Sequence, residues 1–323
     1  YEPYVSGVTT SVKMLKETYE KMGHQVFMVT ANLTEFKFIY DEKKKIIYMP
    51  GIKTGIYDAR LTGFYSTKAL KIVKSWNLDI IHSHTEFGVG TFARIVRKKY
   101  KIPLVHTYHT QYEDYMHYIT KGLFDKTSRK LAAKLTKVYG DSTVDSLIVP
   151  TPKIKELFNT KYKINRHIHV IPTGIDTNKF TLNKDIKSKL PLLMKKYHIQ
   201  KDDFIIGVIG RVAKEKSIDV LIDNMSNIIK NNKHIKLMII GDGPDTKLLK
   251  KLVTNLKINK NVIFTGKVLY EDIAQYYNLL HVLATASKTE TQGLTVIEAL
   301  AATKPVVCFN DPSFSETIIN DYN

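Results

Sequence analysis

Short apolar runs rich in β-branched residues recur along the chain, and stretches with helical periodicity separate them. Nearly continuous apolar strands are typical of a parallel sheet that helices cover on both faces. Strands that alternate with helices of roughly ten to fifteen residues form βαβ units with right-handed connections. The pattern therefore predicts an α/β protein. The predicted strands lie within residues 25–30, 78–84, 102–109, 145–150, 204–210, 235–243, 261–266, 281–287 and 305–309.

The predicted strands fall into two series, separated by a polar stretch with helical character. The first series ends near residues 169–176, and the second begins at Phe204. With 323 residues, the chain is long enough to bury two ordinary cores. We therefore predict two open, Rossmann-like α/β domains facing each other across a cleft, residues 1–172 and residues 173–323. Such sheets bind ligands at the carboxyl ends of their strands, where the topology reverses.

Two cations follow the first predicted strand of the second domain. Gly210 ends that strand, Arg211 and Lys216 lie in the next loop, and a helix begins directly afterwards. A helix N-terminus beside two cations is a good anion site, especially for a diphosphate bound without a metal. An ordinary strand–helix turn with exposed basic residues is the alternative. Gly7 precedes another helix, and backbone nitrogens next to a glycine can approach a phosphate closely.

Two glutamates lie on either side of a glycine near the end of the chain. Glu290 lies in a loop, and Glu298 lies in the following helix, which has Gly293 and Leu294 at its N-terminus. Carboxylates accept hydrogen bonds from hydroxyl groups, whereas helix-end amides and cations bind phosphate. These residues suit a polyhydroxylated ligand attached to a diphosphate. The alternative is an exposed loop acid with a helix acid that the helix dipole stabilises.

Four histidines, His82, His84, His106 and His109, gather at the ends of two adjacent predicted strands. Clustered imidazoles can bind a metal ion. No cysteine accompanies them, however, and the sequence holds no Asp-x-Asp pair. The sequence therefore favours a polar network at these strand ends, with His109 as a candidate for contact with the polyhydroxylated ligand. We predict no metal site.

Positive charge concentrates in the first half of the chain. Lys and Arg exceed Asp and Glu by 49 − 31 = 18 overall, by 28 − 15 = 13 in residues 1–170 and by 21 − 16 = 5 in residues 171–323. A basic domain indicates an anionic partner, although solvated lysine-rich faces are the alternative. The sequence shows neither aromatic–basic interleaving on strands nor a recognition helix, so we do not expect nucleic acid as a partner.

Residues 121–139 hold six Lys or Arg against one Asp. Their helical pattern predicts either a helix that lies on an anionic membrane or an ordinary amphipathic surface helix. The apolar positions are Leu131, Leu135 and Val138, and the basic positions on another face are Lys130, Lys134 and Lys137. No apolar run approaches the length needed to cross a bilayer, no signal peptide opens the sequence, and the single Cys308 is expected to be a buried thiol. These features indicate a cytoplasmic protein.

The motifs of the second half, taken in order, resemble glycosyltransferase family 4. They are GRVAKEKSID, IIGDGP, VIFTGKV and a pair of glutamates eight positions apart followed by ALAATKPVV. The resemblance extends over nearly the whole chain, from YEPYVSGVTTSV through VIPTGIDTNKF to DPSF. It implies a retaining, metal-independent transferase of the GT-B fold that uses a nucleotide sugar and no other cofactor.

The resemblance also implies a role for each candidate residue. Glu290 would contact the hydroxyls of the donor sugar with His109 beside it, and Glu298 would hold the ribose. The diphosphate and base contacts would come from Arg211, Lys216, the backbone near Gly7, Gly293 and Leu294, and the stretch from Gly266 to Val268.

The chain departs from the family pattern in three places. Thr291 and Gln292 replace the Gly-Phe that commonly follows the first glutamate, and Thr303 occupies a position that is usually glycine. The strand expected before residue 1 and the elements expected after residue 323 are absent, so we expect the sequence to be incomplete.

The segments HTEFGVG and HTYHTQYEDY are shared with the bacterial diacylglycerol glucosyltransferases of this family. This closer likeness implies UDP-glucose as donor, diacylglycerol as acceptor, an α-linked product and peripheral attachment to the inner face of the cell membrane. The alternatives are another acceptor, namely a glucosylated diacylglycerol, phosphatidylinositol or a polysaccharide, and a sugar-nucleotide-binding protein without catalysis.

Overall fold

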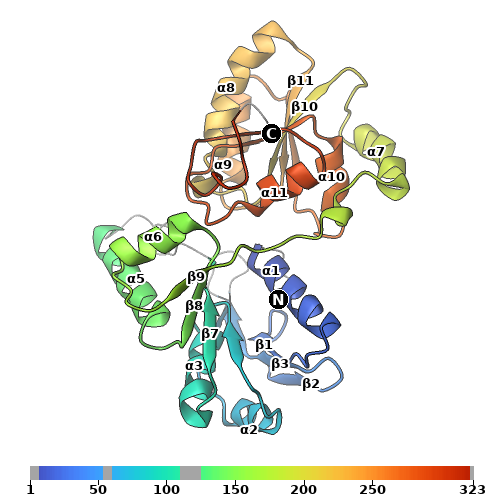
Figure 1. Ribbon diagram of the computed structural model, residues 1–323. Coiled ribbons are helices and arrows are strands. Elements are labelled where there is room, and N and C mark those ends of the chain that lie inside the picture. Colours follow the sequence, from blue (N-terminus) through green and yellow to red (C-terminus); the bar gives the residue numbers. More distant parts are fainter. Residues whose placement is uncertain (1–6, 54–59, 110–124, 321–323) are drawn as a thin grey trace. The chain divides into compact units, whose positions relative to one another are not determined.

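The computed structural model describes residues 7–53, 60–109 and 125–320 (Figure 1). The chain divides into two compact units, unit 1 (Tyr1–Gly174) and unit 2 (Ile175–Asn323). This division lies two residues after the predicted boundary, which was placed between residues 172 and 173.

Unit 2 is built on a five-stranded parallel sheet with the order β12-β11-β10-β13-β14. After β10 the chain adds β11 and β12 on one side of this strand and then β13 and β14 on its other side. The topology therefore reverses between β10 and β13. Such a reversal is the place where open α/β sheets bind ligands. The strands are β10 (Phe204–Ile209), β11 (Ile235–Ile240), β12 (Val262–Gly266), β13 (Val282–Thr285) and β14 (Val306–Cys308).

Helices cover both faces of this sheet, as the continuous apolar strands require (Figure 1). Alternate residues of β11 point to opposite faces, with Leu237 and Ile239 in one core and Met238 and Ile240 in the other. The first core is completed by α8 (Ile218–Asn231) and α9 (Thr246–Asn255). The second is completed by α7 (Lys184–Lys196), α10 (Ile273–Leu279) and α11 (Leu294–Ala301).

Unit 1 contains a four-stranded parallel sheet with the order β6-β7-β8-β9. Its strands are β6 (Ile81–Ser83), β7 (Leu104–Thr107), β8 (Ser146–Val149) and β9 (Ile168–Val170). The helices of the unit are α1 (Gly7–Lys21), α2 (Thr67–Ser75), α3 (Val89–Tyr100), α5 (Asp125–Gly140) and α6 (Pro152–Thr160). Parallel strands with helical crossovers in both units confirm the predicted α/β class with Rossmann-like domains.

Four further strands of unit 1 were not predicted. β1 (Met28–Ala31) pairs in parallel with β3 (Ile46–Met49), and β3 pairs antiparallel with β2 (Ile39–Asp41). A separate antiparallel pair consists of β4 (Gly51–Lys53) and β5 (Arg60–Thr62). Of the strands in these two groups only β1 was predicted. The prediction rested on long apolar runs, whereas β2, β4 and β5 have only three residues each.

Helix α11 ends in a left-handed residue even though that residue is not glycine. Thr303 has φ +58°, its N–H donates to Leu300 O, and the N–H of Lys304 donates to Ala299 O. This pair of bonds satisfies the last carbonyls of the helix, an arrangement that usually uses glycine at the left-handed position. The helix therefore ends at Ala301, and a β-branched residue soon after it takes a conformation that it rarely adopts.

Candidate active site

The reversal point of the unit 2 sheet forms a small pocket. Gly210 follows β10, and its φ of +139° allows the chain to turn sharply into the loop that carries Arg211 and Lys216. The loop after β13 brings in Glu290 from the other side of the reversal. The residues that line the pocket are Val208, Ile209, Gly210, Arg211, Lys216, Ile218, Thr285, Glu290 and Thr295. The structure thus brings together three predicted site residues that are up to 79 positions apart (290 − 211 = 79).

Carboxylates hold both cations of this pocket. Arg211 Nη2 donates to Glu215 Oε1, and Lys216 Nζ donates to Glu290 Oε1 at 2.5 Å. The Glu215 side chain is buried, whereas Arg211 and Lys216 are each about one-quarter exposed. A buried carboxylate restricts the guanidinium to one orientation, so the cation is already ordered when an anion arrives. A diphosphate in the pocket would exchange these carboxylates for phosphate oxygens.

Two hydroxyl groups tie the two loops together, and a third holds the Glu290 loop to the segment after β14. Ser287 Oγ and Thr289 Oγ1 donate to the carbonyl oxygen of Glu215 at 3.3 and 3.4 Å. Ser313 Oγ donates to the carbonyl oxygen of Glu290 at 2.5 Å, and Ser313 is almost fully buried. The loop with the cations and the loop with Glu290 therefore behave as one structural element.

Gly293 is required for the start of α11. Its φ is +76°, and a Cβ atom at this position would lie 2.3 Å from the ring of the buried Phe314. Leu294 is the first residue of the helix, and Thr295 in its first turn lines the pocket. The α11 N-terminus with its unpaired amides therefore faces the same pocket as the cations, which suits an anion.

Glu298 lies apart from that pocket. It is 6% exposed, and Tyr277 Oη donates to its Oε2 at 2.6 Å. Burial raises the pKa of Glu298 to about 7. Burial also raises the pKa of Tyr277 well above its usual value, so the tyrosine stays protonated and donates. The sequence placed both glutamates at one cleft, whereas in unit 2 only Glu290 lines the pocket and Glu298 faces α10.

Three other predicted residues have clear places in the fold. Gly266 ends β12 with φ +73° and forms a bridge to Gly241. Val268 packs against the core that α10 and α11 cover. Gly7 is the first residue of α1 and is exposed.

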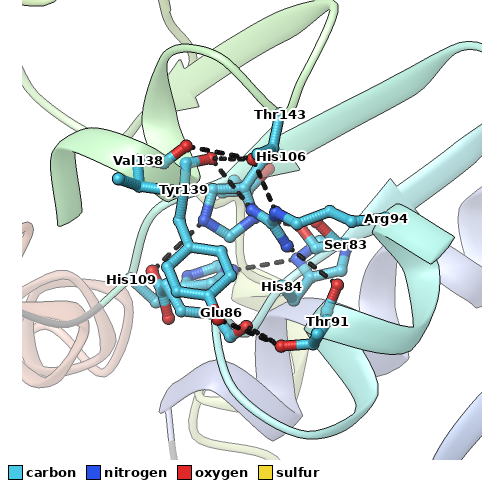
Figure 2. A network of polar contacts seen from close by, with 12 residues as sticks. Ser83, His84, Glu86, Thr91, Arg94, His106, His109, Val138, Tyr139 and Thr143 are labelled. Carbon is cyan, nitrogen blue, oxygen red and sulfur yellow. Dashed lines mark hydrogen bonds and ion pairs between the residues drawn. The ribbon is translucent and has the colours of Figure 1, made fainter. Parts of the chain in front are cut away.

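The four histidines at the ends of β6 and β7 divide between the two faces of the unit 1 sheet. β6 and β7 pair with His82 beside Val105 and Ser83 beside His106, so side chains two residues apart share a face. On one face His82 Nε2 bonds Thr107 Oγ1 at 2.7 Å, and His84 Nδ1 bonds His109 Nε2 at 2.9 Å. On the other face His106 lies 2.8 Å from Ser83 Oγ and 3.2 Å from Glu86 Oε1 (Figure 2). The predicted polar network is present.

Three of these imidazoles are neutral over the range in which proteins are usually active. Burial lowers the pKa of His82 to about 4 and the pKa of His109 to about 3. Burial and three neighbouring histidines lower the pKa of His84 well below its usual value. His109 therefore presents an uncharged ring, of which Nε2 is already engaged with His84 Nδ1.

Within the described ranges, one group of His and acidic side chains converges closely enough to hold a metal ion. It consists of Asp202, Asp203 and His234. Asp203 precedes β10 and His234 precedes β11, so the group lies at the amino ends of the strands, opposite the pocket. It has no part in the site.

Sequence reasoning missed several residues of the site. Glu215 could have been recognised, because a carboxylate four residues after Arg211 is spaced for an ion pair within one turn. Tyr277 and Thr285 carry no local signal, because only the folded sheet brings them to their positions.

The two Rossmann-like units have the fold of solved structures of the GT-B class. Solved structures with this fold include sucrose-phosphate synthase from Thermosynechococcus elongatus, with a TM-score of 0.73, 20% identity and coverage of 98% of this chain and 78% of that one. Another is Anabaena Alr3699/HepE in complex with UDP-glucose, with a TM-score of 0.69, 17% identity and coverage of 98% and 80%. At these identities the likeness shows the fold alone.

Family models match both halves of the chain. The model for Glycosyltransferase Family 4 matches residues 5–179, and the model for Glycosyl transferases group 1 matches residues 191–323. The chain belongs to glycosyltransferase family 4.

Among its relatives are two proteins with the name alpha-monoglucosyldiacylglycerol synthase. The one from Streptococcus pneumoniae is 36% identical over 98% of this chain and 71% of its own length. The one from Acholeplasma laidlawii is 36% identical over 100% of this chain and 81% of its own length.

Proposed function

We propose that this glycosyltransferase transfers glucose from UDP-glucose to diacylglycerol, with retention of the anomeric configuration, and so makes α-monoglucosyldiacylglycerol. The names of the two relatives at 36% identity support the product. The observation that carries the chemistry is the pocket of Arg211, Lys216 and Glu290 at the reversal point of unit 2.

Leaving-group stabilisation is the main task of this pocket. When the bond between glucose and UDP breaks, negative charge grows on the diphosphate. Arg211, Lys216 and the amides at the start of α11 neutralise that charge, and their fixed positions avoid reorganisation during the reaction. The acceptor hydroxyl then attacks from the face that the diphosphate leaves, and its proton passes to an oxygen of the departing diphosphate. We propose that no metal ion takes part, because the cations supply the charge that a metal would supply.

The remaining residues bind the donor. Glu290 and His109 contact hydroxyls of the glucose, and Glu298 accepts from the ribose hydroxyls. The stretch from Gly266 to Val268 lies along the base, and the backbone near Gly7 assists the diphosphate. These roles follow from the family resemblance and agree with the chemistry of each group.

Incubation of the protein with labelled UDP-glucose and mixed lipid vesicles, followed by separation of the lipids, tests the donor and the acceptor. We expect label in an α-glucosylated diacylglycerol and full activity in EDTA. Label in another lipid or a polysaccharide would support the alternative acceptors. Donor binding without any transfer would support a non-catalytic binder, and activity that required Mg²⁺ or Mn²⁺ would contradict the metal-free mechanism.

Single substitutions of the cations test the mechanism. Arg211→Ala or Lys216→Ala should lower turnover about a hundredfold or more, by analogy with the loss of one oxyanion donor. Lys214→Ala is the matched control, because Lys214 belongs to the same turn but is exposed and does not line the pocket. Equal effects at all three positions would show that general loss of positive charge, and not contact with the diphosphate, explains the change.

Diacylglycerol stays in the bilayer, so the enzyme has to work at a membrane surface. The part of the chain that the structure describes contains no helix with the length and apolarity of a membrane span. We propose that α5 supplies the contact with an anionic membrane on the cytoplasmic side. Lys130, Lys134 and Lys137 are exposed on this helix, and Thr136 faces inward. Three tyrosines that precede the helix, Tyr112, Tyr115 and Tyr118, are further candidates for the membrane contact. They lie outside the described residues.

Vesicle sedimentation tests this contact. Each lysine near an anionic surface contributes about 1 kcal/mol, so replacing all three α5 lysines with Glu should weaken binding at least about a hundredfold. Binding should increase with phosphatidylglycerol or cardiolipin and decrease with salt. The matched control replaces the three exposed lysines of α9, Lys247, Lys250 and Lys251, with Glu. Equal sedimentation of the α5 variant and the parent would exclude α5 as the contact.

A further inference from the structure

His84 lies beside His109 on one face of the unit 1 sheet. β6 ends at Ser83 and β7 ends at Thr107, so both histidines follow strand ends that are neighbours in the sheet. His84 Nδ1 and His109 Nε2 are 2.9 Å apart, and their rings are nearly parallel with centroids separated by 5.2 Å (Figure 2). The two imidazoles therefore form a direct hydrogen bond.

A second histidine holds the ring of His84. His82 lies against it, with ring centroids 4.2 Å apart, and His82 Nε2 in turn bonds Thr107 Oγ1 at 2.7 Å. His84 is thus packed between His82 and His109. His106 takes no part in this stack, because it lies on the opposite face with Ser83 and Glu86.

The hydrogen bond couples the tautomers of the two rings. Both imidazoles are neutral, because burial keeps the pKa values of His84 and His109 far below 6.5. A neutral imidazole carries one N–H, and one proton must lie between His84 Nδ1 and His109 Nε2. If His84 donates, the proton of His109 is on Nδ1. If His109 donates, its proton is on Nε2 and its Nδ1 is an acceptor.

We propose that His84 is a positioning residue that fixes the tautomer and the ring orientation of His109. This inference rests on the proposed function only in placing His109 beside the donor sugar. His84 touches no substrate in this scheme. The bond engages Nε2 of His109, so the position of the shared proton decides whether Nδ1 of His109 is a donor or an acceptor toward a hydroxyl of the sugar.

Nitrogen-15 NMR of labelled imidazoles tests the coupling in the ligand-free protein. In the parent, His109 should show one protonated and one unprotonated nitrogen, the signature of a single tautomer of either kind. His84→Leu removes the hydrogen bond, and the two His109 signals should move toward a common average. His84→Asn keeps a polar group near the position of Nδ1 and should restore the separation. The exposed His167 supplies the control variant, His167→Leu, which should leave His109 unchanged.

Kinetics test the consequence for transfer. His84→Leu should lower turnover about tenfold or more, since misplacement of a reacting contact by about 1 Å can cost a hundredfold. The affinity for UDP should change less than about twofold, because the proposed UDP contacts of Arg211, Lys216 and Glu298 lie in unit 2. His84→Asn should recover most of the turnover. In a protein that already carries His109→Ala, His84→Leu should not lower turnover further, because His84 acts only through His109.

Two results would overturn the proposal. One is a single His109 tautomer that persists in folded His84→Leu and His84→Asn proteins alike. The other is an equal loss of turnover from His84→Leu with and without His109. Full turnover of His109→Ala would instead refute the proposed role of His109 at the sugar, and the NMR experiment would still decide whether His84 sets its tautomer. Should His84→Leu fail to fold, His84→Ala, which also removes the hydrogen bond, takes its place in the NMR comparison with the parent and His84→Asn.

Discussion

Replacement of Glu298 by Gln should stabilise unit 2, and the gain should depend on pH. Burial raises the pKa of this carboxyl from 4.5 to about 7. Between these two values the unfolded chain releases the proton while the folded chain keeps it. Stability therefore decreases as pH rises through this interval, and the loss is complete above pH 7. Gln does not ionise, and its amide oxygen can still accept from Tyr277.

The size of the effect follows from the width of the interval. It spans 7 − 4.5 = 2.5 pH units, and each unit corresponds to about 1.36 kcal/mol. Relative to the parent, the Glu298→Gln protein should therefore gain about 3 kcal/mol between pH 4.5 and pH 8. The group is almost fully buried, so solvent screening does not reduce this figure. The difference should grow steadily up to pH 7 and stay constant beyond it.

Urea unfolding at a series of pH values, followed by circular dichroism, measures this difference. The single tryptophan, Trp76, lies in unit 1, so its fluorescence provides an internal control for the other unit. A difference between Glu298→Gln and the parent that is the same at pH 5.5 and pH 8.5 would refute the reasoning. The same variant should bind UDP more weakly, because an amide replaces the carboxylate that accepts from the ribose. Greater stability with weaker binding would identify a group that serves the ligand at a cost to the fold.

Two further outcomes are expected in unit 2. Glu290→Gln should leave the affinity for UDP nearly unchanged but lower the rate of transfer and weaken the preference between glucose and galactose. Calorimetry with UDP and competition between the two sugar nucleotides measure these effects. A loss of UDP affinity equal to that of Glu298→Gln would contradict the division of roles. Thr303→Gly should stabilise the protein by about 1 kcal/mol, because a left-handed conformation costs a residue with a Cβ about 1–2 kcal/mol and part of that gain is lost to the greater freedom of glycine when unfolded. Chemical denaturation measures this gain, and a decrease in stability would show that the Thr303 hydroxyl contributes more than the strain costs.

Much of the fold could be predicted because the strands of a covered parallel sheet are marked by apolar runs. Every run that the sequence indicated contains a strand in the structure. The short strands between residues 39 and 62 could not be found this way, since their pairing depends on a turn at Lys45 and on contact with β1. The short apolar run Ile46–Met49, where three of four residues are buried, was the signal that could have shown β3.

The site was predictable only in part, and for a physical reason. Arg211, Lys216 and Glu290 follow strand ends, and the carboxyl ends of parallel strands meet, so their convergence could be expected. Glu298 lies on a helix, and its carboxyl accepts from Tyr277 on α10, a contact that spacing along the sequence does not reveal. Likewise, spacing placed four histidines at one edge, but only the pairing register of β6 and β7 assigns them to two faces.

The pairing of cations and carboxylates in the pocket has a consequence for encounter kinetics. Arg211 and Lys216 contribute two positive charges, and Glu215 and Glu290 contribute two negative charges, so the sum is 2 − 2 = 0. A doubly charged nucleotide more than a Debye length away, about 10 Å at 0.1 M ionic strength, is not attracted by the group as a whole. Long-range steering of the nucleotide then depends on the excess of five positive charges that residues 171–323 carry elsewhere. The scattered lysines of this domain govern the approach of the nucleotide. The pocket recognises the diphosphate only when its phosphate oxygens come close enough to displace the two carboxylates.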